Sequence, residues 1–575
     1  MTVEIDTSAT PTTSSSHTSS RRSSPMHIDR DAPAEPRRTA SPASTASLNE
    51  AASLQDLHVL IGTFNLATRI PNREVGDVPD LLAWVTPPEG SSSDAKAVVP
   101  DLVVVGFQEL IPQGMGARLP LGGSCHGAAD SGVKRDAGRL EFLDPWIDFV
   151  VRDLEAAYGG GEDGARTYEP YYVSRMIALG IIVFVRRGDG EKVRIRALWE
   201  GDIGTGLLGK YPNKGCVAVG LDIEIVDHHH HHLLPRRRTS LCFANSHLGP
   251  HEGHAYYEWR NEEVRHIFDS LLLQPQTEPV HSADEDDKLP NEIVRALDDF
   301  NAVFYFGDLN YRLMGAGVKD PAARREYRAT VMRHIDAGSV EPLLAMDELC
   351  NIREYLHFRA LAGWLEPPIS FLPSYKYKIE DLELPADHDA GLVLRAEDRF
   401  SKTRMPAYCD RIMYRAMDFH REDHGDSMIG RPRAAGWFTN TTSHAAGADS
   451  KSQVHQDQPP ASWSAARKHT ESAITPIYYH CASSVVWSDH KPVAALFALK
   501  MDAISSRPNP ARIMDTNLQH ALLEWSRKAQ TLRFRETAIN NTFIRITVAA
   551  AVGLLGVVLV LATPSLRSMA RSSDR

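Results

Sequence analysis

The chain has 575 residues, which is long for one domain and fits one large domain with tails or two to three domains. It carries 63 Lys and Arg against 74 Asp and Glu, a formal net charge of −11 at pH 7. This balance excludes a general nucleic-acid coat, so any phosphate site must be locally basic. The six cysteines form no C-x-x-C pair, which argues against a zinc site or a disulfide framework.

The N-terminal part differs sharply in composition from the rest of the chain. Residues 1–52 are rich in Ser, Thr and Pro and have almost no large apolar side chains, so they are predicted to be a disordered tail. Residues 53–500 are predicted to form the globular part. The stretch 418–474 is polar and rich in Ser, Ala and His, and we expect it to be a disordered insertion.

Short apolar runs alternate with helical patterns through the globular part. Many strands with helices spread between them predict one large α/β domain, in which two packed sheets are flanked by helices. The expected strands are 57–64, 101–107, 176–185, 192–198, 214–223, 240–246, 303–306, 408–414 and 492–499. The expected helices are about 143–157, 254–273, 321–336 and 341–362.

Beyond the globular part, residues 501–543 are predicted to be a linker, with an amphipathic helix at 514–536. The 21 residues 546–566 carry no charge. As a helix they would span roughly 31 Å, which matches a hydrocarbon core of about 30 Å. We therefore expect a transmembrane tail anchor at 544–566, followed by a short polar tail, 567–575. The alternative is a buried soluble helix, which is rarely apolar on every face.

Polar side chains follow several predicted strands at the point where each strand ends. They are Asn65, Glu109, His247, Asp308 and Asn310. Sheet proteins commonly assemble their sites at such ends. An Asp and an Asn two residues apart suit a phosphate ester, since the first can orient and deprotonate a water and the second can hold a phosphoryl oxygen. Taken alone, Asp308 and Asn310 equally fit a hairpin turn.

Hydrolysis of a phosphate ester calls for a divalent ion, because negative charge gathers on the oxygens in the transition state. Glu109 and Asn65 are hard oxygen ligands suited to Mg²⁺, although each alone is more often a cap or turn residue. His490 has Asp410 as a candidate partner that would orient its imidazole. Neither the sequence nor its spacing shows that these two side chains touch.

Seven motifs occur in the order typical of the inositol polyphosphate 5-phosphatases, and the chain resembles this family over about 57–499. The family belongs to the endonuclease/exonuclease/phosphatase superfamily. The motifs are Gly62-Thr-Phe-Asn65, Phe107-Gln-Glu109, Asn213-Lys-Gly215, Asn245-Ser-His247, Gly307-Asp-Leu-Asn-Tyr-Arg312, Pro406-x-x-Cys-Asp-Arg411 and Ser488-Asp-His-x-Pro492. Phe64 stands where many members have Trp, a swap that keeps an aromatic ring.

The resemblance implies a four-layer α/β sandwich and Mg²⁺-dependent release of the 5-phosphate by direct in-line attack of water. By motif, Glu109 resembles the principal metal ligand and Asn65 a neighbouring ligand or phosphate contact. The expected catalytic residues are Asp308 as water activator, Asn310 and His490 as phosphate contacts, Asp410 paired with His490, Asp489 near the metal, and His247 as a second phosphate or leaving-group contact.

The resemblance also implies residues that bind the rest of the substrate. They are basic, hydroxyl or amide side chains, matching the family's grip on the 4-phosphate or lying near the scissile phosphate: Asn213, Lys214, Tyr375, Lys376, Lys402 and Arg404. The expected substrate is phosphatidylinositol 4,5-bisphosphate, and no nucleic-acid partner is expected.

Two other interpretations remain open from the sequence. One is a phosphodiesterase of the superfamily, either a nuclease or a sphingomyelinase-like enzyme, and the other is a catalytically idle membrane scaffold. In architecture the chain resembles the yeast-type members of the family that are held at the endoplasmic reticulum by their C-terminus. The expected location is therefore the endoplasmic reticulum membrane with the domain facing the cytosol, and the alternative is the mitochondrial outer membrane.

Overall fold

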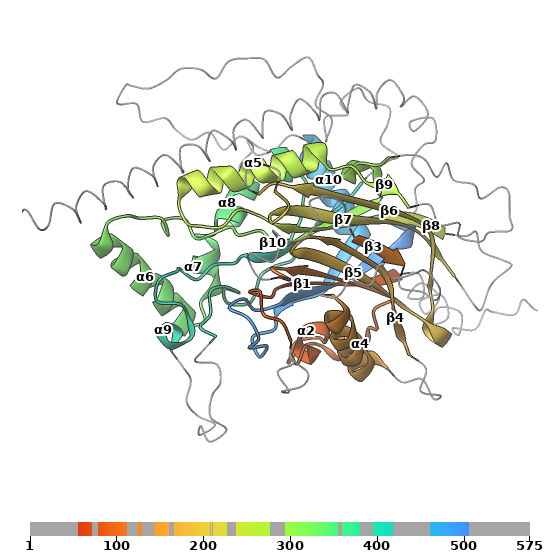
Figure 1. The fold of residues 1–575 in the computed structure, drawn as a ribbon, viewed down its shortest axis with the longest axis horizontal. Coiled ribbons are helices and arrows are strands. Elements are labelled where there is room, and N and C mark those ends of the chain that lie inside the picture. Colours follow the sequence, from red (N-terminus) through yellow and green to blue (C-terminus); the bar gives the residue numbers. More distant parts are fainter. Residues whose placement is uncertain are drawn as a thin grey trace, which may run out of the picture. The chain divides into compact units, whose positions relative to one another are not determined.

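Two β-sheets form the centre of the computed structural model (Figure 1). One sheet has seven strands in the order β12-β13-β1-β2-β5-β4-β3, and the other has six in the order β11-β10-β8-β7-β6-β9. The structure describes residues 56–71, 79–111, 125–128, 143–159, 166–206, 209, 211–226, 237–276, 294–354, 359–379, 395–417 and 461–504.

The seven-stranded sheet is built from β1 (Asp56–Asn65), β2 (Leu102–Gln108), β3 (Cys125–Ala128), β4 (Tyr168–Met176), β5 (Leu179–Arg186), β12 (Ile474–Cys481) and β13 (Val493–Lys500). The six-stranded sheet is built from β6 (Val193–Gly204), β7 (Gly215–Ile225), β8 (Arg237–His247), β9 (Gln274–Pro275), β10 (Ala302–Asp308) and β11 (Asp410–Ala416). The helices are α2 (Leu82–Val85), α3 (Ser93–Ala97), α4 (Asp144–Tyr158), α5 (His254–Ser270), α6 (Pro321–Asp336), α7 (Val340–Leu344), α8 (Glu348–Glu354), α9 (Ala396–Arg399), α10 (Ala461–Ala473) and α11 (Met501–Ile504).

Apolar side chains fill the space between the two sheets and also cover both outer faces. Strands such as β2 and β10 are buried along their whole length, which explains their continuous apolar runs. Helices α2 and α4 pack on the outer face of the seven-stranded sheet, and α5 packs on the outer face of the six-stranded sheet (Figure 1). The prediction of two packed sheets flanked by helices is therefore confirmed.

Four of the described strands, β3, β4, β9 and β12, are not predicted by the sequence, and proline explains two of them, β4 and β12. The sequence predicts a single strand at 176–185, but the structure has the antiparallel pair β4 and β5. It also has β12, for which no strand was expected. Pro170 lies in β4 and Pro476 in β12, each at a shift of the strand register. A proline argues against a central strand but is tolerated at such a bulge.

The expected disordered insertion at 418–474 is wrong in its C-terminal part. Residues 461–473 form helix α10, which contacts β11, β12 and β13. The Thr470 hydroxyl is buried and accepts a hydrogen bond from the Ala416 N–H at 3.1 Å. The small and polar side chains of this stretch do not predict a helix, because tertiary packing and not its own sequence stabilises α10.

Several predicted segments lie outside the described residues. They are the tail 1–52, the insertion from 418 to 460, the linker from 505 to 543 with its amphipathic helix, the apolar segment 544–566 and the tail 567–575. Within the described part of the chain, every helix is too short or too polar to cross a membrane.

One buried amide joins the two sheets below the ends of their strands. Asn245 of β8 donates to the carbonyl oxygens of Phe107 (3.1 Å) and Gly180 (2.8 Å), both in the other sheet. Its Oδ1 accepts from Gln108 Nε2 at 2.6 Å. The amide can approach because Gly106 has no side chain, and a Cβ there would lie 2.5 Å from Asn245 Cγ.

We predict that Asn245→Ala lowers the free energy of unfolding by about 2–4 kcal/mol, because the Phe107 and Gly180 carbonyls and one N–H of the Gln108 amide lose their side-chain partner in a buried layer. Urea unfolding followed by tryptophan fluorescence would measure this loss. Asn351→Ala is the matched control. Asn351 of α8 also donates to two carbonyls, but it is only partly buried. Equal losses for both variants would contradict a special role for the inter-sheet amide.

Candidate active site

The ends of four strands bring the predicted site residues to one edge of the two sheets. Strands β1 and β2 run parallel and place Asn65 opposite Gln108, directly before Glu109. Strands β8 and β10 also run parallel and place His247 opposite Asp308. Because β11 runs antiparallel to β10, its first residue, Asp410, lies opposite Asp308. The expectation that polar residues gather at strand ends is confirmed.

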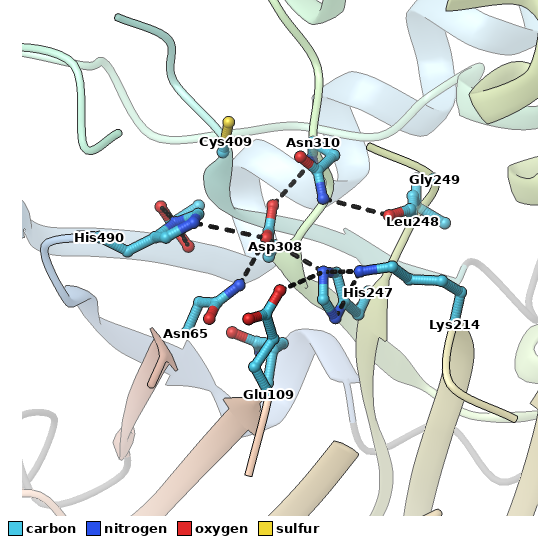
Figure 2. Close-up of polar contacts among 12 residues, drawn as sticks. Asn65, Glu109, Lys214, His247, Leu248, Gly249, Asp308, Asn310, Cys409 and His490 are labelled. Carbon is cyan, nitrogen blue, oxygen red and sulfur yellow. Dashed lines mark hydrogen bonds and ion pairs between the residues drawn. The ribbon is translucent and has the colours of Figure 1, made fainter. Parts of the chain in front are cut away.

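Asp308 lies at the centre of this group (Figure 2). Its carboxylate is buried and accepts from Asn65 Nδ2 at 2.8 Å and from the Asn310 N–H at 3.0 Å. His247 Nε2 lies 3.3 Å and His490 Nε2 lies 3.9 Å from Asp308 Oδ2. Both sheets therefore contribute donors to a single carboxylate.

The charges around Asp308 determine its ionisation. Burial by itself would raise the pKa of this carboxyl, but His490 and His247 hold the pKa below its ordinary value. Burial likewise opposes the charged form of His490, but Asp410 and Asp308 outweigh it and raise the pKa of His490 to about 9. At neutral pH an ionised Asp308 therefore faces a cationic His490.

The predicted partnership of His490 and Asp410 is seen as a direct contact. The His490 Nδ1–H donates to Asp410 Oδ2 at 3.0 Å, and the Ser374 hydroxyl donates to the same oxygen at 2.7 Å. The His490 N–H also donates to Ser488 Oγ at 3.1 Å. These contacts fix the orientation of the imidazole, so that its Nε2 faces Asp308.

Asn310 is held with its amide in a defined orientation. Its backbone has φ +55°, a left-handed conformation that Asn adopts more easily than most residues. Its Nδ2 donates to the Leu248 carbonyl at 3.1 Å, and its Oδ1 accepts from Arg312 Nη2. One N–H of the amide is thereby used, and the other can donate to a ligand.

Lys214 contacts the ring of His247 through its Nζ, as Figure 2 shows. Burial lowers the pKa of His247, and the neighbouring Lys214 ammonium lowers it further. Burial also lowers the pKa of Lys214. His247 is therefore better suited to a neutral imidazole, which can accept a proton or a hydrogen bond.

The side chains at the ends of β1 and β2 suit a divalent cation. The Glu109 side chain is 31% exposed, and its Oε1 lies 3.9 Å from His247 Nε2. Asn65 keeps its Oδ1 on the Ala67 N–H at 2.9 Å. These two hard oxygen donors, next to the Asp308 carboxylate, fit Mg²⁺ by their chemistry. Among the described residues, Asp308, Asp410 and His490 also form a buried acidic and histidine group that could hold a metal ion.

We place the cation at Glu109 and Asn65 and not at the group formed by Asp308, Asp410 and His490. Asp410 already contacts His490 Nδ1 and Ser374 Oγ, so neither of its oxygens is unengaged. A cationic His490 has no lone pair for a metal. Glu109, in contrast, is partly exposed, so its carboxyl oxygens are accessible to an ion.

The predicted substrate-binding residues lie on three segments beside this group. Lys376 Nζ forms an ion pair with Asp489 Oδ2 at 2.5 Å, which raises the pKa of Lys376 against the effect of burial. The Lys376 carbonyl accepts from the Ser401 N–H at 2.8 Å and so ties the segment of Lys402 and Arg404 to it. Lys402 and Asn213 are exposed side chains, and Tyr375 is buried.

The structure brings three further residues into the site, and the sequence predicts no role for them. Ser374 and Arg312 are close in sequence to residues that received a role. Glu263 of α5 is fully buried and accepts from the Gly249 N–H (2.6 Å) and the Thr205 hydroxyl (2.8 Å). It thereby holds the segment that precedes Lys214. The only signal for Glu263 is a charged residue within the apolar stripe of a helix.

Comparison with known proteins gives consistent results. A family model described as Endonuclease/Exonuclease/phosphatase family 2 matches residues 62–430. Type I inositol polyphosphate 5-phosphatase 8 of Arabidopsis thaliana is 27% identical over 380 residues, which cover 63% of this chain and 65% of that protein. A probable inositol polyphosphate 5-phosphatase of Schizosaccharomyces pombe is 27% identical over 324 residues, which cover 55% of this chain and 22% of that protein.

The chain thus spans less than two thirds of the length of these two relatives. Among solved structures, it is similar to the inositol polyphosphate 5-phosphatase domain of SPsynaptojanin, crystallised with inositol (1,4)-bisphosphate and calcium ion. The identity is 16%, the match covers 88% of this chain and 99% of that chain, and the TM-score is 0.42.

We predict that His490 makes stability depend on pH when metal is removed with a chelator. Its pKa is about 9 in the folded protein and about 6.5 in an unfolded chain. The stabilisation is therefore fully present below pH 6.5 and is lost as the pH rises through 9. Its loss amounts to on the order of 3 kcal/mol at most. Urea unfolding of the unmodified protein and of His490→Gln, at pH 6.5 and 9.5, would measure it.

The difference in the free energy of unfolding between the unmodified protein and His490→Gln should become smaller as the pH rises. The control is His254→Gln, because His254 is an exposed residue at the start of α5. It should leave the pH dependence unchanged. A difference between His490→Gln and the unmodified protein that is the same at both pH values would show that His490 is not the titrating group.

Proposed function

Because the chain belongs to the endonuclease/exonuclease/phosphatase family 2, we propose that it is a phosphoric monoester hydrolase that removes the 5-phosphate of inositol polyphosphates. The observation that carries the proposal is the pair of an ionised Asp308 and a cationic His490, with 3.9 Å between Oδ2 and Nε2. The Arabidopsis and Schizosaccharomyces relatives bear the name of inositol polyphosphate 5-phosphatases, which supports the same reaction.

The residues at this edge account for the requirements of in-line attack by water. Asp308 orients the water and accepts its proton as the P–O bond to the inositol breaks. Its low pKa makes it a weak base, which suffices because the transition state of phosphoryl transfer is loose and demands little early deprotonation. His490 and Asn310 donate to the phosphoryl oxygens, where negative charge accumulates.

Glu109 and Asn65 would hold Mg²⁺, which when bound supplies positive charge for the phosphoryl oxygens. Their position next to Asp308 supports this assignment. Lys214 and His247 also lie beside Asp308, and Lys214 contacts the imidazole of His247. They are suited to a phosphoryl oxygen and to the oxygen that leaves with the inositol.

We propose phosphatidylinositol 4,5-bisphosphate as the substrate. Lys376, Lys402 and Arg404 lie on two segments joined by the hydrogen bond from the Ser401 N–H to the Lys376 carbonyl. Their positive charges, with the amide of Asn213, suit a second phosphate monoester beside the scissile one. A phosphodiester substrate offers no second phosphate monoester for these cations to bind, which weighs against a nuclease or a sphingomyelinase-like enzyme.

The test is phosphate release by the full-length protein in detergent with Mg²⁺, with four substrates side by side. We expect release from phosphatidylinositol 4,5-bisphosphate and not from the 4-phosphate, and we expect the 5-phosphate to be a poorer substrate and a DNA duplex to stay intact. Asp308→Asn should lower kcat by about 10³-fold or more while unfolding near the same temperature. Activity on DNA alone would refute the proposed function, as would full turnover by a folded Asp308→Asn variant.

We further propose that the uncharged segment 546–566 holds the enzyme at a membrane, with the endoplasmic reticulum as the first candidate and the mitochondrial outer membrane as the second. The domain would face the cytosol, where its lipid substrate is within reach. Confinement to a surface raises the local concentration of a lipid substrate without any new contact.

We predict that the protein co-sediments with phosphatidylcholine vesicles and that the double substitution Leu555→Arg/Val558→Arg releases it. Each Arg near the centre of a membrane helix costs about 3 kcal/mol. The matched control, Leu555→Ala/Val558→Ala, keeps the segment uncharged and should still sediment with the vesicles. Sedimentation of the Arg variant to the same extent would contradict the anchor.

A further inference from the structure

The Tyr375 side chain contacts two parts of the site at once. Only 8% of the residue is exposed. Its ring centroid lies 4.6 Å from that of His490, and the Arg312 guanidinium carbon lies 4.4 Å from the ring centroid, over the ring. A buried aromatic ring thus packs against both a guanidinium and an imidazole, and both of these groups can carry positive charge.

The Tyr375 backbone fixes the position of this ring. Its N–H donates to the Ala407 carbonyl at 3.2 Å, and its carbonyl accepts from the Ala407 N–H at 2.8 Å. On one side, Ser374 donates to Asp410, the partner of His490. On the other side, Lys376 pairs with Asp489. The Tyr375 ring therefore belongs to a segment that also contacts Asp410, the partner of His490, and Asp489, the residue before His490.

Arg312 connects the same ring to Asn310. The Arg312 side chain is buried, its Nε donates to the Asn310 carbonyl at 3.0 Å, and its Nη2 donates to Asn310 Oδ1. Its backbone N–H donates to Glu348 Oε2 at 2.8 Å, which ties the residue to α8. Arg312 can only donate and the Leu248 carbonyl can only accept, so these two groups together determine which end of the Asn310 amide faces inward. If Arg312 moved, the amide would lose one of the two contacts that fix its orientation.

We propose that Tyr375 and Arg312 are positioning residues. The Tyr375 ring packs against both the His490 imidazole and the Arg312 guanidinium, and Arg312 in turn helps to orient the Asn310 amide. The two groups that donate to the scissile phosphate are thereby set at a fixed separation by one aromatic spacer. A shift of about 1 Å in either donor can cost on the order of 100-fold in rate.

This inference rests on the proposed function and adds to it. The family resemblance implies a contact between Tyr375 and the phosphate at position 4, which only its hydroxyl can make. The positioning role belongs instead to the ring. The two roles can be separated, because Phe keeps the ring without the hydroxyl, and because phosphatidylinositol 5-phosphate has no phosphate at position 4.

The experiment compares Tyr375→Phe and Tyr375→Leu on phosphatidylinositol 5-phosphate and on the 4,5-bisphosphate, with the full-length protein. Tyr375→Leu should lower kcat by about 100-fold on both lipids with KM changed by less than about 3-fold. Tyr375→Phe should keep kcat within about 3-fold on the 5-phosphate. Equal losses for Phe and Leu, or a loss by Leu confined to the 4,5-bisphosphate, would overturn the positioning role.

Tyr377→Leu provides a control for the loss of a buried ring. Tyr377 is 6% exposed, and its ring packs on Phe400, with 4.3 Å between the ring centroids, and under the Lys491 ammonium. It should lower the unfolding temperature about as much as Tyr375→Leu without the roughly 100-fold loss of kcat. If Tyr375→Leu does not fold, Tyr375→Met serves in its place, since Met fills much of the volume without a ring face.

A double-mutant cycle tests whether the two residues act as a unit. Arg312→Lys keeps the charge but loses the planar guanidinium and its fork on Asn310. Combined with Tyr375→Leu it should lower kcat no further than about 3-fold beyond the worse single variant. A fully multiplicative loss would overturn the spacer. If the unmodified protein releases phosphate from neither lipid, the proposed function fails first, which is a distinct outcome.

Discussion

The Asp308 carboxylate is the point at which the two halves of the fold meet. Asn65, from the seven-stranded sheet, and His247, from the six-stranded sheet, both direct polar groups at it. A buried carboxylate is costly unless donors surround it, so Asp308 constrains how the two sheets pack. The hydrogen bonds of the Asn245 amide between the sheets and the contact of Asp410 with His490 stabilise this arrangement further.

Much of the architecture could be predicted because the strands of this domain are buried on both faces and read as continuous apolar runs. The strands β1, β2, β8, β10 and β13 were expected near their observed bounds. The errors have local causes. Proline within β4 and β12 argues against a strand unless a bulge is foreseen, and α10 depends on packing against β11 that its own composition does not reveal.

The site could be predicted as far as its motifs reach. Asp308, Asn310, His490 and Asp410 were named from the sequence, and their contacts follow from the strand register. The support around them could not be predicted in the same way. Glu263 acts from a helix through hydrogen bonds to two loops, and such a link between distant segments has no local pattern.

The pairing of β1 with β13 has a consequence for the order in which the protein is made. The first and last strands of the domain lie side by side, and Asn65 and Asp308 are 243 positions apart in the sequence. A nascent chain must therefore carry an exposed β1 edge, and an incomplete phosphate site, until β13 (Val493–Lys500) has left the ribosome. We therefore expect chaperones to protect that edge until the domain is complete, because an exposed strand edge is prone to aggregation.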